Sequence, residues 1–262
     1  TAVTPTANGG AITGWSISPS LPSGLSIDSS TGEISGTPSA VTSSAVYTVT
    51  ATNTGGSTTA DVTIVVNDIA PTSITYSPNS FTLTKGSAMT SVTPTESGGT
   101  IITWSVSPSL PNGLSIDSST GEISGTPTDV TSSATYTITG SNTGGSTTAD
   151  ITIVVNDVAP SSLVYSPNSF TLTKGTAMTS VTPTYSGGTV TTWAHSLGLP
   201  AGLNFDFSTG EFSGTPTAVT SSITITVTAT NSGGSTTTTV TFVVNDVAPS
   251  SMSYTPTNSL TL

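Results

Sequence analysis

The 262-residue sequence contains no cysteine, one histidine and only two basic residues, Lys85 and Lys174. Without cysteine the chain can form neither a disulfide nor a thiolate metal site. A formal net charge of −11 excludes the clustered Lys and Arg that bind a nucleic-acid backbone. No apolar run comes near the roughly 18 residues that a membrane-spanning helix needs. We therefore expect no nucleic-acid partner and no membrane insertion.

The chain does contain an internal repeat. Trp15, Trp104 and Trp193 are evenly spaced, since 104 − 15 and 193 − 104 both give 89 residues. A fixed period of this length is typical of an array of similar domains. The repeat predicts three units and a terminal segment, with the boundaries 1–70, 71–159, 160–248 and 249–262.

Alternating β-branched residues predict strands throughout each unit. The run at 47–52 reads YTVTAT, and Gly-rich punctuation such as the segment at 53–57 (NTGGS) is typical of a hairpin turn. Trp104 and Val106 lie two apart, so we expect both to face the core. No window shows a helical period. For the second unit we expect strands near 73–76, 80–84, 91–95, 100–107, 114–117, 122–125, 135–141 and 149–155.

Two longer strings carry a family resemblance. Residues 21–38 read LPSGLSIDSSTGEISGTP and residues 47–68 read YTVTATNTGGSTTADVTIVVND, and both patterns return in the later units. The chain resembles the Putative Ig domain repeats of bacterial and archaeal surface proteins, which are relatives of cadherin-like sandwiches. The resemblance implies an all-β chain of three tandem Ig-like or cadherin-like β-sandwich domains, located outside the cell or at its surface. Such modules occur in adhesins, surface-layer proteins, enzyme accessory regions and fibres.

The terminal segment repeats the opening of the other units. Residues 249–262 (PSSMSYTPTNSLTL) match 71–83 (PTSITYSPNSFTL) and 160–172 (PSSLVYSPNSFTL) with one Thr inserted. The first unit starts at a later point, because its TAVTPT matches TSVTPT at 90–95. We expect domain 1 to lack its first strand and residues 249–262 to act as a donor strand, exchanged with a neighbouring subunit.

The donor strand predicts a subunit interface and a function. Its apolar positions are Met252, Tyr254, Leu260 and Leu262, and burying four such side chains is worth roughly 6–12 kcal/mol before ordering costs. Head-to-tail strand addition propagates into a filament, so the expected partners are identical subunits of an extracellular polymer. The alternative is that the sequence is an excerpt from the stalk of a long repeat-containing adhesin or surface-layer protein.

Catalytic and metal-binding residues are scarce. His195 takes the place of Ile17 and Val106, which indicates a packed strand residue, and we expect no enzyme activity. Asp28 and Asp68 recur in all three units, but no Asp-x-Asp string completes a calcium site. We interpret Asp28 as a turn former and Asp68 as a strand-end residue that bonds the backbone. No cofactor is expected, with junctional calcium as the alternative.

A ligand-binding adhesin is a third class. It would need an exposed aromatic platform, and the Trp residues are predicted to lie in the core. Contacts with glycans or other surface molecules stay open at this point.

Overall fold

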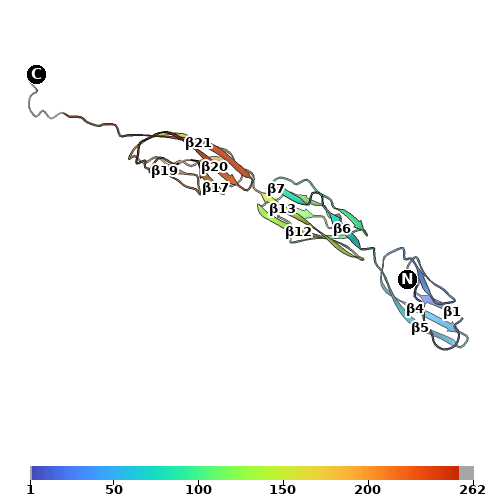
Figure 1. The fold of residues 1–262 in the computed structure, drawn as a ribbon. Helices are drawn as coiled ribbons and strands as arrows, with labels where there is room; N and C mark the ends of the chain where they lie inside the picture. Colours follow the sequence, from blue (N-terminus) through green and yellow to red (C-terminus); the bar gives the residue numbers. More distant parts are fainter. Residues whose placement is uncertain (1, 197, 254–262) are drawn as a thin grey trace, which may run out of the picture.

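The computed structural model describes residues 2–196 and 198–253. These residues form twenty-one strands, arranged as three β-sandwich domains that follow one another in an extended row (Figure 1). Across the described ranges we find no helix of the length and apolar character needed to cross a membrane. The predicted all-β class is confirmed.

Domain 2 packs two layers around one core. A four-stranded sheet in the order β7-β13-β12-β9 faces the antiparallel pairs β6-β8 and β10-β11. The most deeply buried side chains, Ile123, Ile138, Ile153 and Val155, are fully inaccessible. The strands are β6 (Pro71–Thr75), β7 (Ser80–Thr84), β8 (Thr95–Gly98), β9 (Thr103–Ser107), β10 (Leu114–Ile116), β11 (Ile123–Gly125), β12 (Thr131–Asn142) and β13 (Gly145–Asn156).

Domain 3 has the same arrangement with a more aromatic core. Its sheet runs β15-β21-β20-β17 and faces the pairs β14-β16 and β18-β19. Phe212 and Phe242 are fully buried, with ring centroids 5.2 Å apart. The strands are β14 (Ser161–Val164), β15 (Ser169–Thr173), β16 (Thr184–Ser186), β17 (Thr192–His195), β18 (Leu203–Phe205), β19 (Phe212–Gly214), β20 (Thr220–Asn231) and β21 (Gly234–Asn245).

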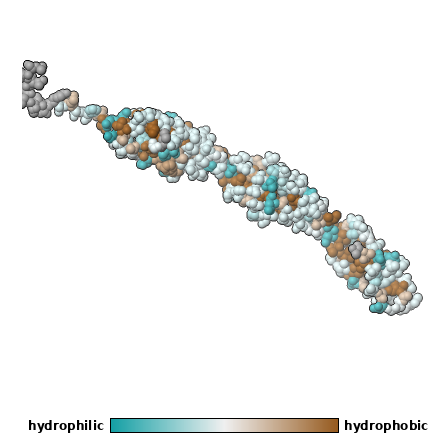
Figure 2. All heavy atoms as spheres, in the orientation of Figure 1, coloured by the Kyte–Doolittle hydropathy of each residue, from teal (hydrophilic) through white to brown (hydrophobic). Residues whose placement is uncertain are grey.

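Domain 1 has a smaller sheet. The order is β1-β4-β5, so β5 is paired on one side only within residues 2–70, and β2 pairs with β3. Figure 2 shows apolar, brown residues at the surface of this domain, at the lower right. The strands are β1 (Gly14–Ser18), β2 (Leu25–Ile27), β3 (Ile34–Gly36), β4 (Thr42–Asn53) and β5 (Gly56–Val66).

The opening segment of a complete domain contributes to both layers. In domain 2 its first half, β6, pairs antiparallel with β8, placing Ile74 opposite Glu96. Its second half, β7, pairs in parallel with β13, placing Phe81 opposite Ile153. Residues 2–70 contain no strand equivalent to β6, β7 or β8, so the main sheet of domain 1 has three strands instead of four and the β6-β8 pair has no counterpart there.

Seven of the eight strands expected in domain 2 occur near the expected positions, and the eighth is displaced. The expectation of a strand over 91–95 was wrong: Val92 makes an isolated bridge to Ile123, and β8 begins only at Thr95. Pro94 explains the shift, since it has no backbone N–H to give to a ladder. Trp104 is 7% exposed and Val106 packs against the same core, so their shared inward face is confirmed.

Candidate assembly site: an open groove in domain 1

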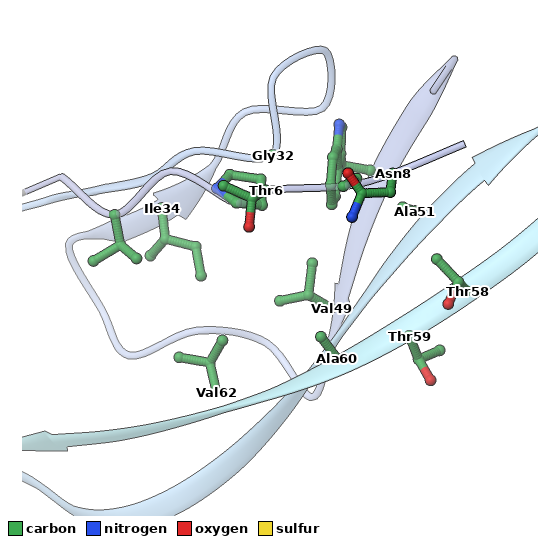
Figure 3. A pocket seen from close by; sticks show the side chains of 14 residues that line it. Thr6, Asn8, Gly32, Ile34, Val49, Ala51, Thr58, Thr59, Ala60 and Val62 are labelled. Carbon is green, nitrogen blue, oxygen red and sulfur yellow. The ribbon is translucent and has the colours of Figure 1, made fainter. Parts of the chain in front are cut away.

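An open groove lies between the two layers of domain 1 (Figure 3). It has a volume of about 490 Å³ and continues into a second hollow of about 310 Å³ along β5. The first hollow is lined mainly by aliphatic and aromatic groups together with a few Thr side chains. Residues that line one or both hollows include Trp15, Gly32, Ile34, Val49, Val62 and Ile64.

The corresponding space in domain 2 is filled by the opening segment. Ile74, Tyr76 and Phe81 lie there and are only 7%, 4% and 8% exposed. Under their cover Ile151 and Ile153 on β13 are 1% and 0% exposed. This comparison inside one chain shows which side chains fit such a groove: an aliphatic residue, a tyrosine and a phenylalanine.

Domain 1 leaves the matching residues partly uncovered. Val62 and Ile64 on β5, the counterparts of the buried isoleucines on β13, are only half-buried, as is Trp15. Val3, at the mouth of the groove, is 57% exposed. Apolar surface left in contact with water is the driving force for strand addition.

A carbonyl group at the groove matches one that accepts a tyrosine hydrogen bond in each of the other two domains. In domain 2 the Tyr76 hydroxyl donates a 2.6 Å hydrogen bond to the carbonyl oxygen of Gly121, and burial raises the pKa of Tyr76 above its ordinary value. In domain 3 Tyr165 makes the same 2.6 Å bond to Gly210. Gly32 holds the corresponding position in domain 1, beside the ring of Trp15. A tyrosine entering the groove therefore has an acceptor available.

The predicted interface residues fall at the edge of the described chain. Met252 is 82% exposed. Tyr254, Leu260 and Leu262 lie outside the described residues. Their role as donor-strand residues stays a prediction.

The recurring carboxylates have two different roles. The Asp28 Oδ1 accepts hydrogen bonds from the amides of Ser30 (2.7 Å) and Thr31 (2.9 Å), which confirms its role as a turn former. Asp68 instead exchanges hydrogen bonds with Thr143 of the next domain. Within residues 2–196 and 198–253, no group of three or more His, Cys, Asp or Glu side chains is placed to hold a metal ion.

These turns predict a loss of stability in acid. Backbone hydrogen bonds from Thr31 and Ser30 lower the pKa of Asp28, bonds from Ser119 and Thr120 lower that of Asp117, and bonds from Ser208 lower that of Asp206. A carboxyl group whose pKa is lower in the folded than in the unfolded state stabilises the fold when it is ionised. This stabilisation is fully present above the unfolded-state pKa of about 3.9, and it is lost as the pH falls through the folded-state pKa.

We therefore expect a melting temperature that is flat from about pH 9 to pH 5 and falls below about pH 4. Calorimetry across this range measures it. The triple variant Asp28→Asn, Asp117→Asn, Asp206→Asn keeps the acceptor oxygens and should flatten the acid limb; an unchanged limb would contradict this origin.

Domain 3 carries an aromatic cluster that sequence reasoning missed. His195 stacks on Phe207 with ring centroids 5.5 Å apart and meets the edge of Phe205 at 5.1 Å. Phe207 is 59% exposed. The signal was the replacement of Ser118 by Phe207 at the equivalent turn position. One exposed ring is a smaller surface than the platform a ligand-binding adhesin would need.

Comparison with known families decides the classification. The Putative Ig domain model matches three stretches of the sequence, residues 1–67, 71–156 and 160–245. The chain belongs to the Putative Ig domain family. This match confirms the resemblance drawn from the repeated motifs.

Curated relatives include an adhesin. The chain is 36% identical over 188 residues to the serine-rich adhesin for platelets of Staphylococcus aureus, a match covering 68% of this chain and 8% of that protein. The corresponding adhesin of strain MRSA252 is 35% identical over 188 residues, covering 13% of its length. The matched region is thus a small part of each relative.

Two solved structures align with most of this chain. An I-band fragment of titin aligns with a TM-score of 0.41 and 12% identity, covering 90% of this chain and 87% of the fragment. The extracellular domain of protocadherin GammaB4 aligns with a TM-score of 0.31 and 18% identity, covering 94% of this chain and 46% of that one.

Proposed function

We propose that this chain is a segment of the stalk of a long cell-surface adhesin, where tandem Ig-like domains hold a distal part away from the cell. The observation that carries the proposal is the serial arrangement itself: three related sandwiches follow one another end to end with short linkers (Figure 1). The likeness to part of a staphylococcal adhesin supports the same role.

The surface chemistry suits a spacer. Charged residues make up 6% of the sequence, and the exposed faces of the long hairpins are dominated by Thr and Ser. Such a surface is well hydrated yet offers few of the charged or aromatic anchors that dominate binding interfaces. The proposed role is therefore mechanical rather than enzymatic, and the proposed location is outside the cell.

A series of chain lengths tests this role. Arrays of two, four and eight copies of residues 71–159 would be placed between a surface anchor and an N-terminal epitope. A rod raises the epitope in proportion to the number of repeats, whereas a flexible chain raises it with about the square root of that number. Linear growth in the measured height supports the stalk, and square-root growth overturns it.

A second candidate function rests on the open groove of domain 1. Here residues 249–262 of another copy occupy the groove by strand addition, with Met252 and Tyr254 taking the positions of Ile74 and Tyr76. The similarity of this segment to residues 71–83, together with the Gly32 carbonyl acceptor, favours that occupant. The product is a head-to-tail filament. Sedimentation and electron microscopy of the chain at rising concentration test this candidate.

A further inference from the structure

The hairpin turn between β12 and β13 holds the linker that enters domain 2. The Asn142 Nδ2 donates hydrogen bonds to the carbonyl oxygens of Ile69 (2.7 Å) and Thr100 (3.1 Å). Its Oδ1 accepts hydrogen bonds from the amides of Gly144 (2.8 Å) and Gly145 (3.1 Å). One side chain thus shapes its own turn and binds the preceding linker.

The neighbouring turn residues complete this contact. The Asp68 amide donates to the Thr143 Oγ1 at 2.9 Å, and the Thr143 hydroxyl donates to the Asp68 carboxylate at 3.0 Å. A Cβ added to Gly144 would clash with the Asp68 carbonyl oxygen, and one added to Gly145 would lie 3.2 Å from the Cβ of Ala70. Gly144 therefore permits the close approach of the linker, and Gly145 lies beside Ala70 with a φ of +154°.

The joint between domains 2 and 3 repeats the arrangement. The Asn231 Nδ2 donates to the Val158 carbonyl oxygen at 2.7 Å, and its Oδ1 accepts from the Gly233 amide at 2.8 Å. The Asp157 amide donates to the Ser232 Oγ at 2.8 Å. Asn231 is only 6% exposed, so its hydrogen bonds are shielded from water.

The turn binds the backbone of the linker and not the side chain at its centre. Ile69 and Val158, whose carbonyl groups are bound, point their side chains outward and are 77% and 45% exposed. The linker strings at 68–71 and 157–160 (Asp-x-Ala-Pro) and the turn strings at 142–145 and 231–234 (Asn-Thr/Ser-Gly-Gly) are therefore matched partners.

We propose that this hairpin turn is a clamp that fixes each repeat on the one before it, making the joints stiff without a metal ion. Proline restriction of the linker alone would leave the next domain free to swing about the bonds that follow. Three hydrogen bonds between the turn and the linker, together with the close approach of Gly144 to the Asp68 carbonyl group, remove that freedom at the joint between domains 1 and 2.

Domain 1 supplies a matched control. Its turn at 53–56 has the same Asn-Thr-Gly-Gly sequence, and the Asn53 Oδ1 accepts from the Gly55 amide at 2.8 Å. A Cβ added to Gly55 would meet only the Asn53 Oδ1, at 3.2 Å, and no linker atom. Changes there perturb the turn but not a joint.

The test measures the joint between domains 1 and 2 in the full chain. Because the sequence has no cysteine, Ser44→Cys and Ser133→Cys provide two exposed, unique sites for a dye pair. Asn142→Asp keeps the turn acceptor but turns a carboxylate oxygen toward the Ile69 carbonyl. We expect a broader transfer-efficiency distribution and cleavage at 67–70 by a broad-specificity protease that is about tenfold faster.

Matched control variants and an EDTA control test whether the clamp stiffens the joint. Asn53→Asp should leave the distribution and the cleavage rate unchanged, and EDTA should change neither in the parent chain. Thr143→Ala, with Thr54→Ala as its control, gives a second reading if Asn142→Asp fails to fold. A distribution that stays narrow in both Asn142→Asp and Thr143→Ala, or one that broadens in EDTA, would overturn the clamp.

Discussion

Extending the N-terminus with a copy of residues 71–89 will raise the stability of domain 1 by at least about 2 kcal/mol. Thr1 aligns with Thr90, so the copy continues directly into the domain. Its Ile, Tyr and Phe side chains enter the open groove as Ile74, Tyr76 and Phe81 do in domain 2. Three such burials are worth roughly 4–9 kcal/mol before the cost of ordering the segment.

Hydrogen exchange resolved by domain measures this effect, because β4 and β5 report on domain 1 separately. An extension whose copy carries Tyr76→Ser and Phe81→Ser has the same length and is the control. Equal protection of β4 and β5 in both extended chains would show that the groove is not a strand acceptor.

The same pair of chains separates the two candidate functions. If a second copy donates residues 249–262, the parent chain assembles with rising concentration and the extended chain, whose groove is already filled, stays monomeric. Electron microscopy and sedimentation distinguish these outcomes. A parent chain that is monomeric at all concentrations, or an extended chain that still forms fibres, excludes head-to-tail exchange through this groove and leaves the stalk segment.

Gly121→Ala will destabilise domain 2 by about 2–5 kcal/mol. Gly121 has a φ of +71°, and an added Cβ would lie 2.7 Å from a ring carbon of Trp104. The cost therefore combines left-handed strain with overpacking against the central Trp. The carbonyl that binds Tyr76 belongs to the same residue, so any backbone shift that relieves the clash weakens that bond.

Gly86→Ala is the matched control for that substitution. Its φ of +77° is nearly the same, but an added Cβ meets nothing within 4 Å. Only the backbone cost of about 1–2 kcal/mol applies. Denaturant unfolding monitored by domain-resolved hydrogen exchange should give a clearly lower free energy of unfolding of domain 2 for Gly121→Ala than for Gly86→Ala. Equal losses would show that the Trp–Gly contact does not carry the expected energy.

Local patterns predicted most of the fold. The alternation around Trp104 and Val106 gave the core face, and the Gly-rich segment at 53–57 gave a hairpin, because both depend on neighbours in sequence. Pro94 was the local signal that the expectation for 91–95 overlooked. The groove could also be anticipated, since it follows from comparing one repeat with the next.

Contacts between distant residues could not be predicted in the same way. The turn role of Asn142 is visible in its sequence, but its bond to Ile69 joins residues 73 apart in two domains. The opening segment contributes to two layers because β7 pairs in parallel with β13. The alternation of residues within each strand does not predict this pairing. The stacking of His195 on Phe207 likewise arises only when β17 meets the turn that follows β18.

Small-angle X-ray scattering of the parent chain in EDTA will show whether the three domains form a stiff rod without a metal ion. We expect the profile of an extended rod whose maximum dimension equals three sandwiches placed end to end, unchanged on adding calcium. A profile typical of three domains on flexible tethers, or one that becomes rod-like only with calcium, would contradict it.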